Sequence, residues 1–467
     1  MARHDLSEGQ EIDGFRIGAR LHQGGMAALW EATHPAHDLP LLVKVPRLAE
    51  GDDPAAIVSF EMEQMILPRL SGPHVPRFLG AGGFDRQPYL AMERIPGPTL
   101  LPLVEELPLR IERIAEIGAR VADALDALHR QHVVHLDIKP SNILTRPTGE
   151  AVLVDFGLSH HRQLPDLMQE EFRLPYGTAP YMAPEQVMRV RSDPRSDLFA
   201  LGAMLYFLTT GARPHGDPQR LAGLKRRLWR DPIPPRRLRA DCPDWLQEII
   251  LRCLEVLPER RHPTAAQLAF DLRHPDRVAL TARARKARQD GFVRVMQRRF
   301  GRQPRFARPG ADSPESGAAA PLVVVAVDLA AEAALLGAMR ATLGQILATL
   351  PGARLACVYV LQQLISPVGT HDEEERNPHL QRLIELKHWA APLRLPEGRA
   401  TFHVLEAASP AAAILDHARL NGVDHIVIGA RAQSLRRRVL GSVCAAVASE
   451  VPCSVTVVRT RQREQEP

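Results

Sequence analysis

The chain has 467 residues, of which 45% are hydrophobic and 24% are charged, and it carries a formal net charge of +5. That length exceeds what a single hydrophobic core supports, so two or three domains are expected. The composition excludes a disordered or fibrous protein. Positive charge is concentrated in residues 277–308, where eleven Arg and Lys accompany one acid, Asp290. The basic character therefore belongs to one segment of the chain.

The five cysteines are odd in number and form no CxxC pair, which excludes a disulfide framework and a clustered zinc site. A reducing, cytoplasmic location is therefore expected. The first ten residues, MARHDLSEGQ, contain no apolar signal region, and the most apolar tract, residues 322–350, is interrupted by three charged residues. We expect no membrane span and no membrane partner.

The first half of the chain opens with short apolar runs at residues 15–21, 28–33 and 39–45, which predict β-strands. Helical patterns dominate afterwards. The clearest lies at about 110–130, where apolar residues recur at three- and four-residue spacing and predict an amphipathic helix that faces a core. Residues 132–144, HVVHLDIKPSNIL, then place an Asp, a Lys and an Asn in a polar loop between two strand-like segments.

A different pattern follows residues 308–321, RPGADSPESGAAAP, which have the composition of a flexible connector. Strands are predicted at 322–327, 354–360, 425–430 and 453–458. Between them lie a long Ala/Leu-rich helix, a second helix at 410–420, which ends at Asn421-Gly422, and an apolar helix before the last strand. Repeated alternation of strand and helix predicts a parallel α/β sheet.

Single residues of the first half carry little information alone. The glycines in LHQGGMAAL, residues 21–29, let backbone amides approach a phosphate, but a Gly-Gly pair equally makes a plain hairpin turn. Lys44 ends an apolar strand, Glu63 lies in a helix and Asp155 follows a strand, and each position is also ordinary for a surface side chain.

Their order and spacing together resemble the eukaryotic-type protein kinase family over about residues 14–272. The matching segments are LLVK ending at Lys44, the helix carboxylate Glu63, HLDIKPSN at 135–142, DFG at 155–157, GTAPYMAPE at 177–185, SDLFALG at 196–202 and Arg261. The resemblance implies a bilobal α+β fold, with a small lobe at about 14–95 and a large lobe at about 96–275. The form DxKxxN resembles serine/threonine kinases, so the implied partners are proteins that carry Ser or Thr.

The resemblance also implies a role for each site residue. Asp137 would accept the proton of the substrate hydroxyl, assisted by Lys139 and Thr178. Asn142 and Asp155 would hold Mg²⁺ or Mn²⁺. Asp197 would hold the backbone of the catalytic loop, and Arg261 would pair with Glu185. The residues implied to bind ATP or to position groups that bind it are Leu21, Gly24, Gly25, Leu29, Lys44, Glu63, Met92, Glu93, Ile95, Asn142 and Asp155.

Two departures from the family pattern bear on function. His22 and Ala27 stand where the family has glycines, so a nucleotide-sensing pseudokinase scaffold is the alternative to an active enzyme. Leu136 replaces the Arg that reads an activation-segment phosphate in the family, and residues 160–177 contain no Ser or Thr. We therefore expect activity that does not depend on phosphorylation of this segment. Local contacts would hold the segment instead, with Asp166, Glu170 and Glu171 as fixed negative charge, and control would come from the C-terminal domain or from partners.

From residue 321 to about 460 the chain resembles the universal stress protein family. The resemblance rests on VVVAVD, which ends at Asp328, and on IVIGARAQSLRRRVLGS, which contains Gly429, Gly441 and Ser442. It implies a parallel-sheet domain that pairs through its last strand, so a homodimer is expected, with this domain as a regulatory or dimerisation module. Ala432 replaces the second glycine of the motif. A weak nucleotide site at Asp328, Gly429, Gly441 and Ser442 is therefore weighed against a structural turn, which is slightly favoured.

The division that follows is a tail at 1–13, a kinase-like domain at 14–275, a basic segment and linker at 276–320, a stress-protein-like domain at 321–460 and a tail at 461–467. The basic segment, within 277–308, has two interpretations. Clustered Arg interleaved with Phe292, Phe300 and Phe306 suits nucleic acid. Packing on a neighbouring domain through its apolar residues, with the arginines solvated, is favoured.

Overall fold

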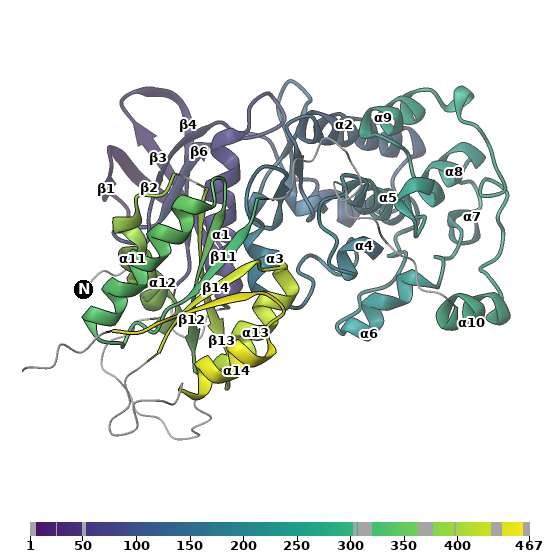
Figure 1. Ribbon diagram of the computed structural model, residues 1–467. Helices are drawn as coiled ribbons and strands as arrows, with labels where there is room; N and C mark the ends of the chain where they lie inside the picture. Colours follow the sequence, from purple (N-terminus) through teal and green to yellow (C-terminus); the bar gives the residue numbers. More distant parts are fainter. Residues whose placement is uncertain are drawn as a thin grey trace, which may run out of the picture.

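The computed structural model describes residues 6–24, 26–48, 53–301, 306, 320–362, 377–396, 398–430 and 441–460. Figure 1 shows a mainly helical body at one end, a purple β-rich lobe at the other, and a green and yellow C-terminal domain beside that lobe. The bilobal fold and the parallel-sheet domain expected from the sequence are both confirmed. In the described residues, no helix is long and apolar enough to cross a bilayer.

The small lobe is one antiparallel sheet with the strand order β1-β2-β3-β4-β6-β5 and a helix, α1. All three predicted strands are present. Buried side chains alternate with accessible ones over part of each strand, at Phe15 and Ile17 of β2, Trp30 and Ala32 of β3, and Leu41, Val43 and Val45 of β4. The elements are β1 (Glu11–Ile12), β2 (Phe15–Gln23), β3 (Ala27–His34), β4 (His37–Pro46), α1 (Pro54–Ile66), β5 (Phe78–Gly82) and β6 (Tyr89–Glu93).

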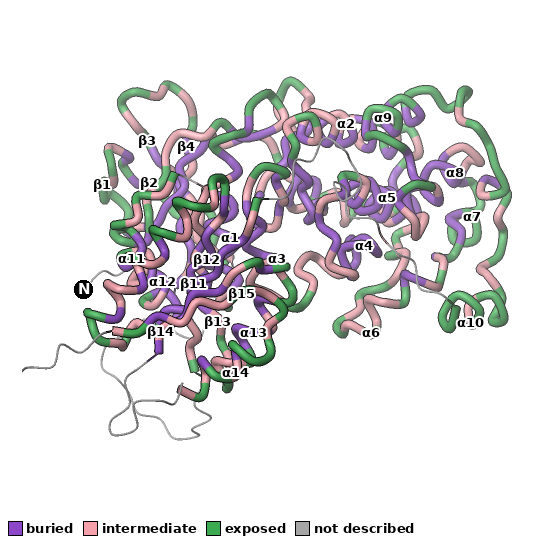
Figure 2. The backbone as a smooth tube through the Cα atoms, in the orientation of Figure 1, coloured by how far each residue is buried: buried purple, intermediate pink, exposed green. Residues whose placement is uncertain are grey.

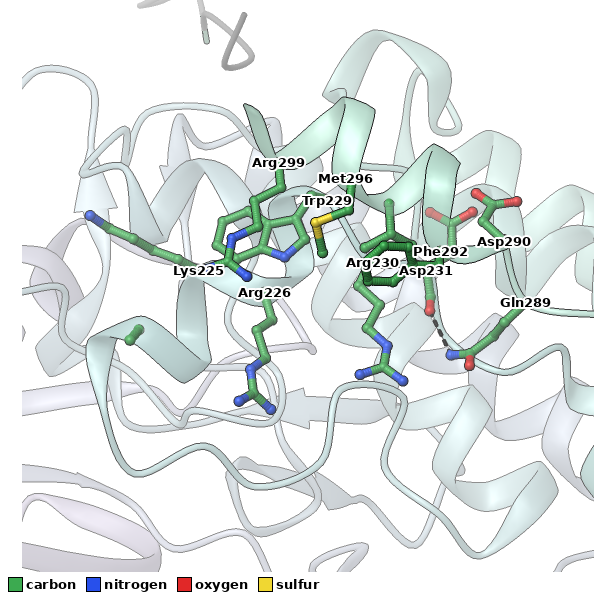
Figure 3. Close-up of a pocket in the computed structure, with 12 residues that line it drawn as sticks. Lys225, Arg226, Trp229, Arg230, Asp231, Gln289, Asp290, Phe292, Met296 and Arg299 are labelled. Carbon is green, nitrogen blue, oxygen red and sulfur yellow. Dashed lines mark hydrogen bonds between the residues drawn. The ribbon is translucent and has the colours of Figure 1, made fainter. Parts of the chain in front are cut away.

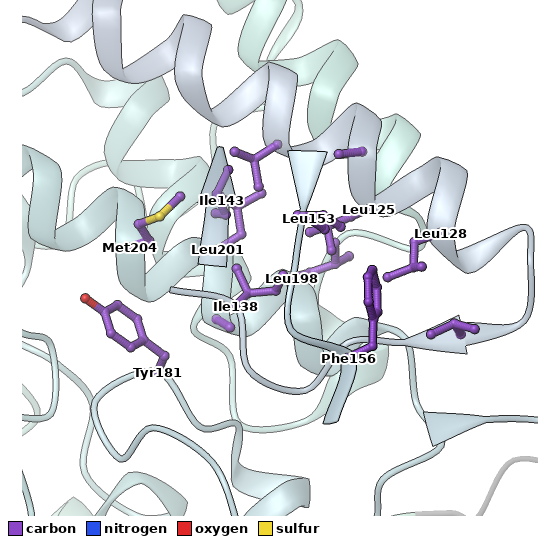
Figure 4. Packing of buried hydrophobic residues seen from close by; sticks show 14 of the residues in the cluster. Leu125, Leu128, Ile138, Ile143, Leu153, Phe156, Tyr181, Leu198, Leu201 and Met204 are labelled. Atoms are coloured by element: carbon purple, nitrogen blue, oxygen red, sulfur yellow. The ribbon is translucent and has the colours of Figure 1, made fainter. Parts of the chain in front are cut away.

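The large lobe packs around α2 (Ile111–His129) and α5 (Arg195–Thr210), with α8 (Asp244–Cys253) and α9 (Ala265–Arg273) outside them. The apolar stripe of α2 predicted from its spacing is buried. Figure 4 shows Ile138, within the polar loop, and Ile143, directly after it, among buried side chains that include Leu125 of α2 and Leu198 of α5. The buried side chains of Ile138 and Ile143 therefore attach the polar loop to the core of the large lobe.

Shorter elements complete the large lobe. Strand β7 (Val133–Val134) pairs with β10 (His160–His161), and β8 (Ile143–Thr145) pairs with β9 (Ala151–Leu153). The short helices are α3 (Leu167–Glu171), α4 (Pro184–Val187), α6 (Leu221–Leu224) and α7 (Pro235–Leu238). Helix α10 (Phe292–Phe300), in the basic segment, lies at the far end of the molecule and is largely exposed (Figure 2).

The C-terminal domain is a five-stranded parallel sheet with the order β13-β12-β11-β14-β15. Alternate residues of β11 face opposite sides: Val323 and Val325 pack with α11 and α12, and Val324 packs with α13 and α14. Gly422, with φ of +62°, ends α13 as expected. The elements are β11 (Leu322–Ala326), α11 (Ala333–Thr349), β12 (Arg354–Leu361), α12 (Pro378–Ala390), β13 (Ala400–Glu406), α13 (Pro410–Asn421), β14 (His425–Gly429), α14 (Ser442–Glu450) and β15 (Ser454–Val458).

Two of these elements, α12 and β13, are absent from the sequence prediction. Together with β12 and α13, they lie against α1 and α3 of the first domain (Figure 1). The two domains are therefore in direct contact.

Candidate functional site

In the polar loop between β7 and β8, three side chains surround the carboxylate of Asp137. Oδ1 of Asp137 accepts hydrogen bonds from the backbone N–H of Thr178 at 3.0 Å and from its hydroxyl at 2.6 Å. Oδ2 accepts from Lys139 Nζ at 2.7 Å and from Asn142 Nδ2 at 3.0 Å. Lys139 also donates to the Thr178 hydroxyl at 3.0 Å. The loop at 137–142 and the segment at 178 thus form one hydrogen-bonded unit.

A buried acid on α5 holds this loop. Asp197 accepts from the backbone N–H of His135 at 2.9 Å and of Leu136 at 2.8 Å, and it also pairs with His129 Nε2 at 2.8 Å. Leu136 has φ of +66°, an uncommon backbone conformation for a residue other than glycine. Its side chain is buried, and its carbonyl accepts from Gln186 Nε2 at 2.9 Å. Leu136 therefore holds the loop in place through its buried side chain and its backbone hydrogen bonds, in a strained backbone conformation.

Lys44 of β4 lies between two carboxylates. Its Nζ is 2.5 Å from Glu63 Oε2 on α1 and 2.9 Å from Asp155 Oδ1. Burial would lower the pKa of Lys44, but the charges of Asp155 and Glu63 outweigh it and raise that pKa. The charge of Lys44 in turn lowers the pKa of Asp155. A cation is therefore fixed between the small lobe and the start of the activation segment.

The hairpin between β2 and β3 closes through Gly24, whose N–H donates to the Ala27 carbonyl at 2.9 Å. The His22 ring lies against this turn, because a Cβ built on Gly24 would be 3.4 Å from His22 Nε2. Leu21 is exposed and Leu29 is half-buried on the flanking strands. Gly25, also expected at this site, lies outside the described residues.

Met92, Glu93 and Ile95, which the kinase resemblance implies bind ATP, lie at the end of β6 and directly after it. Met92 and Ile95 are buried. The carboxylate of Glu93 is held by Arg146, with Nη2 2.9 Å from Oε2, and this bond lowers the pKa of Glu93. The side chain of Glu93 is therefore committed to the protein, which leaves only its backbone to contact a ligand.

The activation segment is anchored by a buried ion pair that sequence reasoning missed. Arg191 Nε donates to Asp166 Oδ2 at 2.7 Å, and Arg191 Nη2 donates to the Leu158 carbonyl at 2.8 Å. Asp166 also caps α3 by accepting from the N–H of Gln169 at 3.1 Å. At the other end of the segment, Glu185 forms a fully buried pair with Arg261, at 2.6 and 2.8 Å, as expected.

The other two acids expected to hold this segment bind elsewhere. Glu170 and Glu171 contact His403 of β13, at 3.1 and 3.4 Å, in the C-terminal domain. The sequence interpretation of all three acids as local anchors is therefore wrong for these two. Only Asp166 is bound within its own domain.

A family model described as "Protein kinase domain" matches residues 15–271, and these are the residues that carry the site above. The chain belongs to the protein kinase family. A second model, described as "Universal stress protein family", matches residues 322–459. The boundary between the matches falls in the basic segment and connector.

Among similar proteins, serine/threonine-protein kinase PknB of Mycolicibacterium smegmatis is 32% identical over 271 residues, which cover 56% of this chain and 42% of that protein. A probable serine/threonine-protein kinase of Clostridium perfringens is 28% identical over 278 residues, covering 59% of this chain and 40% of that protein. The match thus spans about two fifths of these relatives. The crystal structure of the Mycobacterium tuberculosis PknI kinase domain superposes with a TM-score of 0.46 at 23% identity, covering 58% of this chain and 99% of that chain.

The stress-protein domain of this kinase contains its own cavity of about 510 Å³. The four residues expected there, Asp328, Gly429, Gly441 and Ser442, all line it. Apolar side chains also line the cavity. Met339 lies so close to Gly429 that a Cβ added to this glycine would be 2.7 Å from the Met339 Sδ. Ala432 and most of the loop between the two glycines lie outside the described residues.

The basic segment packs on the large lobe, in part as expected, since Ala284 is fully buried and Val278 packs against the core. Some of its basic residues are paired rather than solvated: Lys286 and Arg298 pair with Asp231 at 2.6 and 2.7 Å. Phe292 and Phe300 are instead 74% and 78% exposed. Figure 3 shows the neighbouring cavity of about 700 Å³, where Trp229 and Met296 lie among several arginines.

Proposed function

We propose that the protein is a serine/threonine protein kinase that transfers the γ-phosphoryl group of ATP to protein hydroxyls. The observation that carries this proposal is the unit around Asp137, which holds one carboxylate oriented by Lys139 and Thr178. In phosphoryl transfer the protein chiefly positions groups and neutralises charge. Asp137 accepts the proton of the attacking hydroxyl, Lys139 steadies the transferred phosphate, and Lys44 contacts the remaining phosphates.

Asn142 and Asp155 fit a divalent cation. Nδ2 of Asn142 donates to the carbonyl and the carboxylate of Asp137, and the amide oxygen, which accepts from the Ser141 hydroxyl at 3.3 Å, is the atom that would coordinate the ion. The Asp155 side chain is 44% exposed, although its Oδ1 faces Lys44. Oxygen atoms are the ligands that Mg²⁺ and Mn²⁺ prefer. Bound there, the ion would supply charge neutralisation at the phosphates.

We further propose that the active arrangement needs no phosphate on the activation segment. Asp166 and Arg191 supply a permanent ion pair inside the segment, and Leu136 provides no phosphate-binding side chain. Because the anchoring charge is part of the sequence, the segment does not require a modifying enzyme to order it.

The C-terminal domain is proposed to regulate the kinase and to pair two chains. Each chain is proposed to bind one ATP, in its kinase domain. Strand β15 is the edge of its sheet and suits pairing with a second copy. On this proposal, Gly429 belongs to a structural turn, and the cavity beside it does not bind nucleotide. Titration of the full chain with ATP checks this, because a second site tighter than high micromolar contradicts it.

The test of the kinase activity is transfer of radiolabelled phosphate from ATP to the protein itself and to casein. We expect label with the wild type and a loss of about 10²–10⁴-fold with Asp137→Ala. Asp123→Ala, at an exposed ion pair with Arg273, is the matched control and keeps full activity. Absence of label with the wild type contradicts the proposal and favours the nucleotide-sensing scaffold.

A further inference from the structure

Helix α1, which carries Glu63, has no solvent-facing side. Residues 55–63 of this helix are all buried, and Figure 2 shows the tube through α1 in purple. Its sequence, PAAIVSFEMEQMI, is apolar around the whole circumference, which is typical of a helix covered on every side. The small lobe covers the side that carries Glu63. Another part of the molecule must cover the opposite side.

The stress-protein domain provides that cover. Glu61 lies two positions from Glu63, so the two carboxylates point to different sides of α1. Glu61 pairs with Lys387 of α12. The Nζ of Lys387 lies 5.4 Å from the ring centre of Phe84 in the small lobe and 5.8 Å from that of Phe402 on β13. Leu380, Leu383 and Val404 of the stress-protein domain belong to the same apolar cluster as α1.

The activation-segment helix α3 is held by the same domain. Glu170 pairs with Arg354 of β12 at 2.6 Å and with His403 of β13 at 3.1 Å. Its carbonyl accepts from Asn421 Nδ2 of α13 at 3.1 Å. Glu171 lies 3.5 Å from His379 Nε2 of α12. The end of α3 thus contacts four elements of the second domain: β12, α12, β13 and α13.

Charge in these contacts is complementary. At the contacts just described, the kinase domain contributes carboxylates and the stress-protein domain contributes Arg, Lys and His. The peripheral pair of Arg173 with Asp416 reverses this polarity. Buried pairs of opposite charge fix the register of an interface, and loss of one partner leaves an uncompensated charge. The kinase surface at α1 and α3 is therefore matched to the chain's own second domain.

We propose that the stress-protein domain is a built-in activator, which clamps α1 and α3 so that Glu63 and the activation segment stay in the transfer-competent arrangement. This inference rests on the proposed kinase activity. The clamp acts on both elements at once, because α12 contacts Glu61 and Glu171 while β13 contacts Glu170 and Glu171. Release of the domain exposes the apolar outer side of α1 and removes the partners of α3, so it lowers the transfer rate.

A charge-swap series in the full chain tests the clamp. Glu61→Lys and Lys387→Glu each place like charges together, and the double variant restores an opposite pair. We expect each single variant to lower the rate on casein about tenfold, within the range of coupling between domains, and the double variant to recover to within about threefold of the wild type. Arg419→Glu, an equal charge reversal on α13 that disturbs only the exposed pair with Glu450, keeps the wild-type rate.

Hydrogen exchange at residues 53–66 separates this inference from the proposed activity. Exchange should rise in both single variants and return in the double variant, whether or not phosphate is transferred. Lys387→Gln, at a position whose side chain is 34% exposed, is the milder change if a reversal prevents folding. The clamp is overturned if the single variants show the same casein rate and the same hydrogen exchange as the wild type. It is also overturned if the double variant transfers phosphate no faster than either single variant. A wild type that transfers no phosphate overturns both proposals, but raised exchange still demonstrates docking.

Discussion

Arg191 and Asp166 form an ion pair in which both side chains are more than 90% buried, with Nε 2.7 Å from Oδ2. Burial alone would raise the pKa of Asp166, but the charge of Arg191 and the contact with His160 hold it at about 2. Asp166 is therefore ionised at neutral pH, and we propose that this pair supplies the charge that a phosphate would otherwise add to the segment.

Replacement of Asp166 by Asn leaves Arg191 buried without its counter-charge. Breaking a buried pair in this way costs roughly 3–5 kcal/mol of unfolding free energy. We expect a lower midpoint in thermal unfolding and a loss of kinase activity. Because the folded-state pKa is depressed, the stabilisation is present above about pH 4 and is lost as the pH falls toward 2. Asp217→Asn, at an exposed pair with Arg213, should change stability by less than about 1 kcal/mol, and equal effects of the two variants would contradict this account.

Treatment with phosphatase should leave the wild-type rate on casein within about tenfold, which corresponds to 1.4 kcal/mol in the barrier. The reason is that Asp166 and Arg191 already order the segment. Mass spectrometry of residues 160–177 checks that the segment is unmodified during the assay. A larger loss, restored by preincubation with ATP together with phosphate on this segment, would show that modification is needed.

Asp197→Ala should disable the catalytic loop without touching a reacting group. Three donors lose their acceptor: the N–H of His135, the N–H of Leu136 and Nε2 of His129. Hydrogen bonds to a charged acceptor contribute about 1.5–3 kcal/mol each, and Leu136 would be free to leave its strained conformation. We expect a fall in kcat of about 10²-fold with a smaller change in the KM for ATP. A variant with normal kcat would mean that the loop is held by its apolar neighbours alone.

Much of the kinase site was predictable from sequence because its parts are close in the chain or follow a fixed order. Asp137, Lys139 and Asn142 share one loop, and the structure brings Thr178 to them. The contact between domains was not predicted, since it joins Glu61 to Lys387 and Glu170 to His403, pairs that no local pattern connects. One signal was available: the all-round apolar sequence of α1 requires cover from outside its own lobe. The acids of α3 were noticed, but their charge alone does not identify their partners.

The full-length protein should be a dimer that pairs through β15, with twice the 51.7 kDa mass of one chain. Ser454 is exposed on this edge strand, and a like charge on each copy opposes edge-to-edge pairing. Ser454→Lys should therefore give a monomer by light scattering at micromolar concentration. Ser449→Lys, at an exposed position of α14, is the matched control and stays dimeric. A monomeric wild type would refute the expectation.

The strength of the contact between the two domains is expected to depend on pH through His403. Its ring is fully buried and is faced by Glu170 and Glu171 from α3, by Thr401 on its own strand and by His417 on α13. Burial alone would lower the pKa of His403, but the two carboxylates outweigh it and raise the pKa to about 9. Burial lowers the pKa of His417 to about 3, so His403 is the cation of this pair of rings.

The sign of the pH dependence follows from that shift. A histidine whose folded pKa is raised stabilises the docked state fully below its unfolded value of about 6.5, and that stabilisation is lost as the pH rises through about 9. Arg354, which also pairs with Glu170, retains part of the contact. Hydrogen exchange of residues 53–66 and 167–171 should therefore increase more steeply between pH 6.5 and 9.5 in the wild type than in His403→Gln, after correction for intrinsic exchange. The variant should show at least about tenfold faster exchange than the wild type at pH 6.5, the effect of one pKa unit, and the two should converge above pH 9. A constant ratio across this range would mean that His403 is neutral in the docked state and that Arg354 and Lys387 hold the acids of the kinase without it.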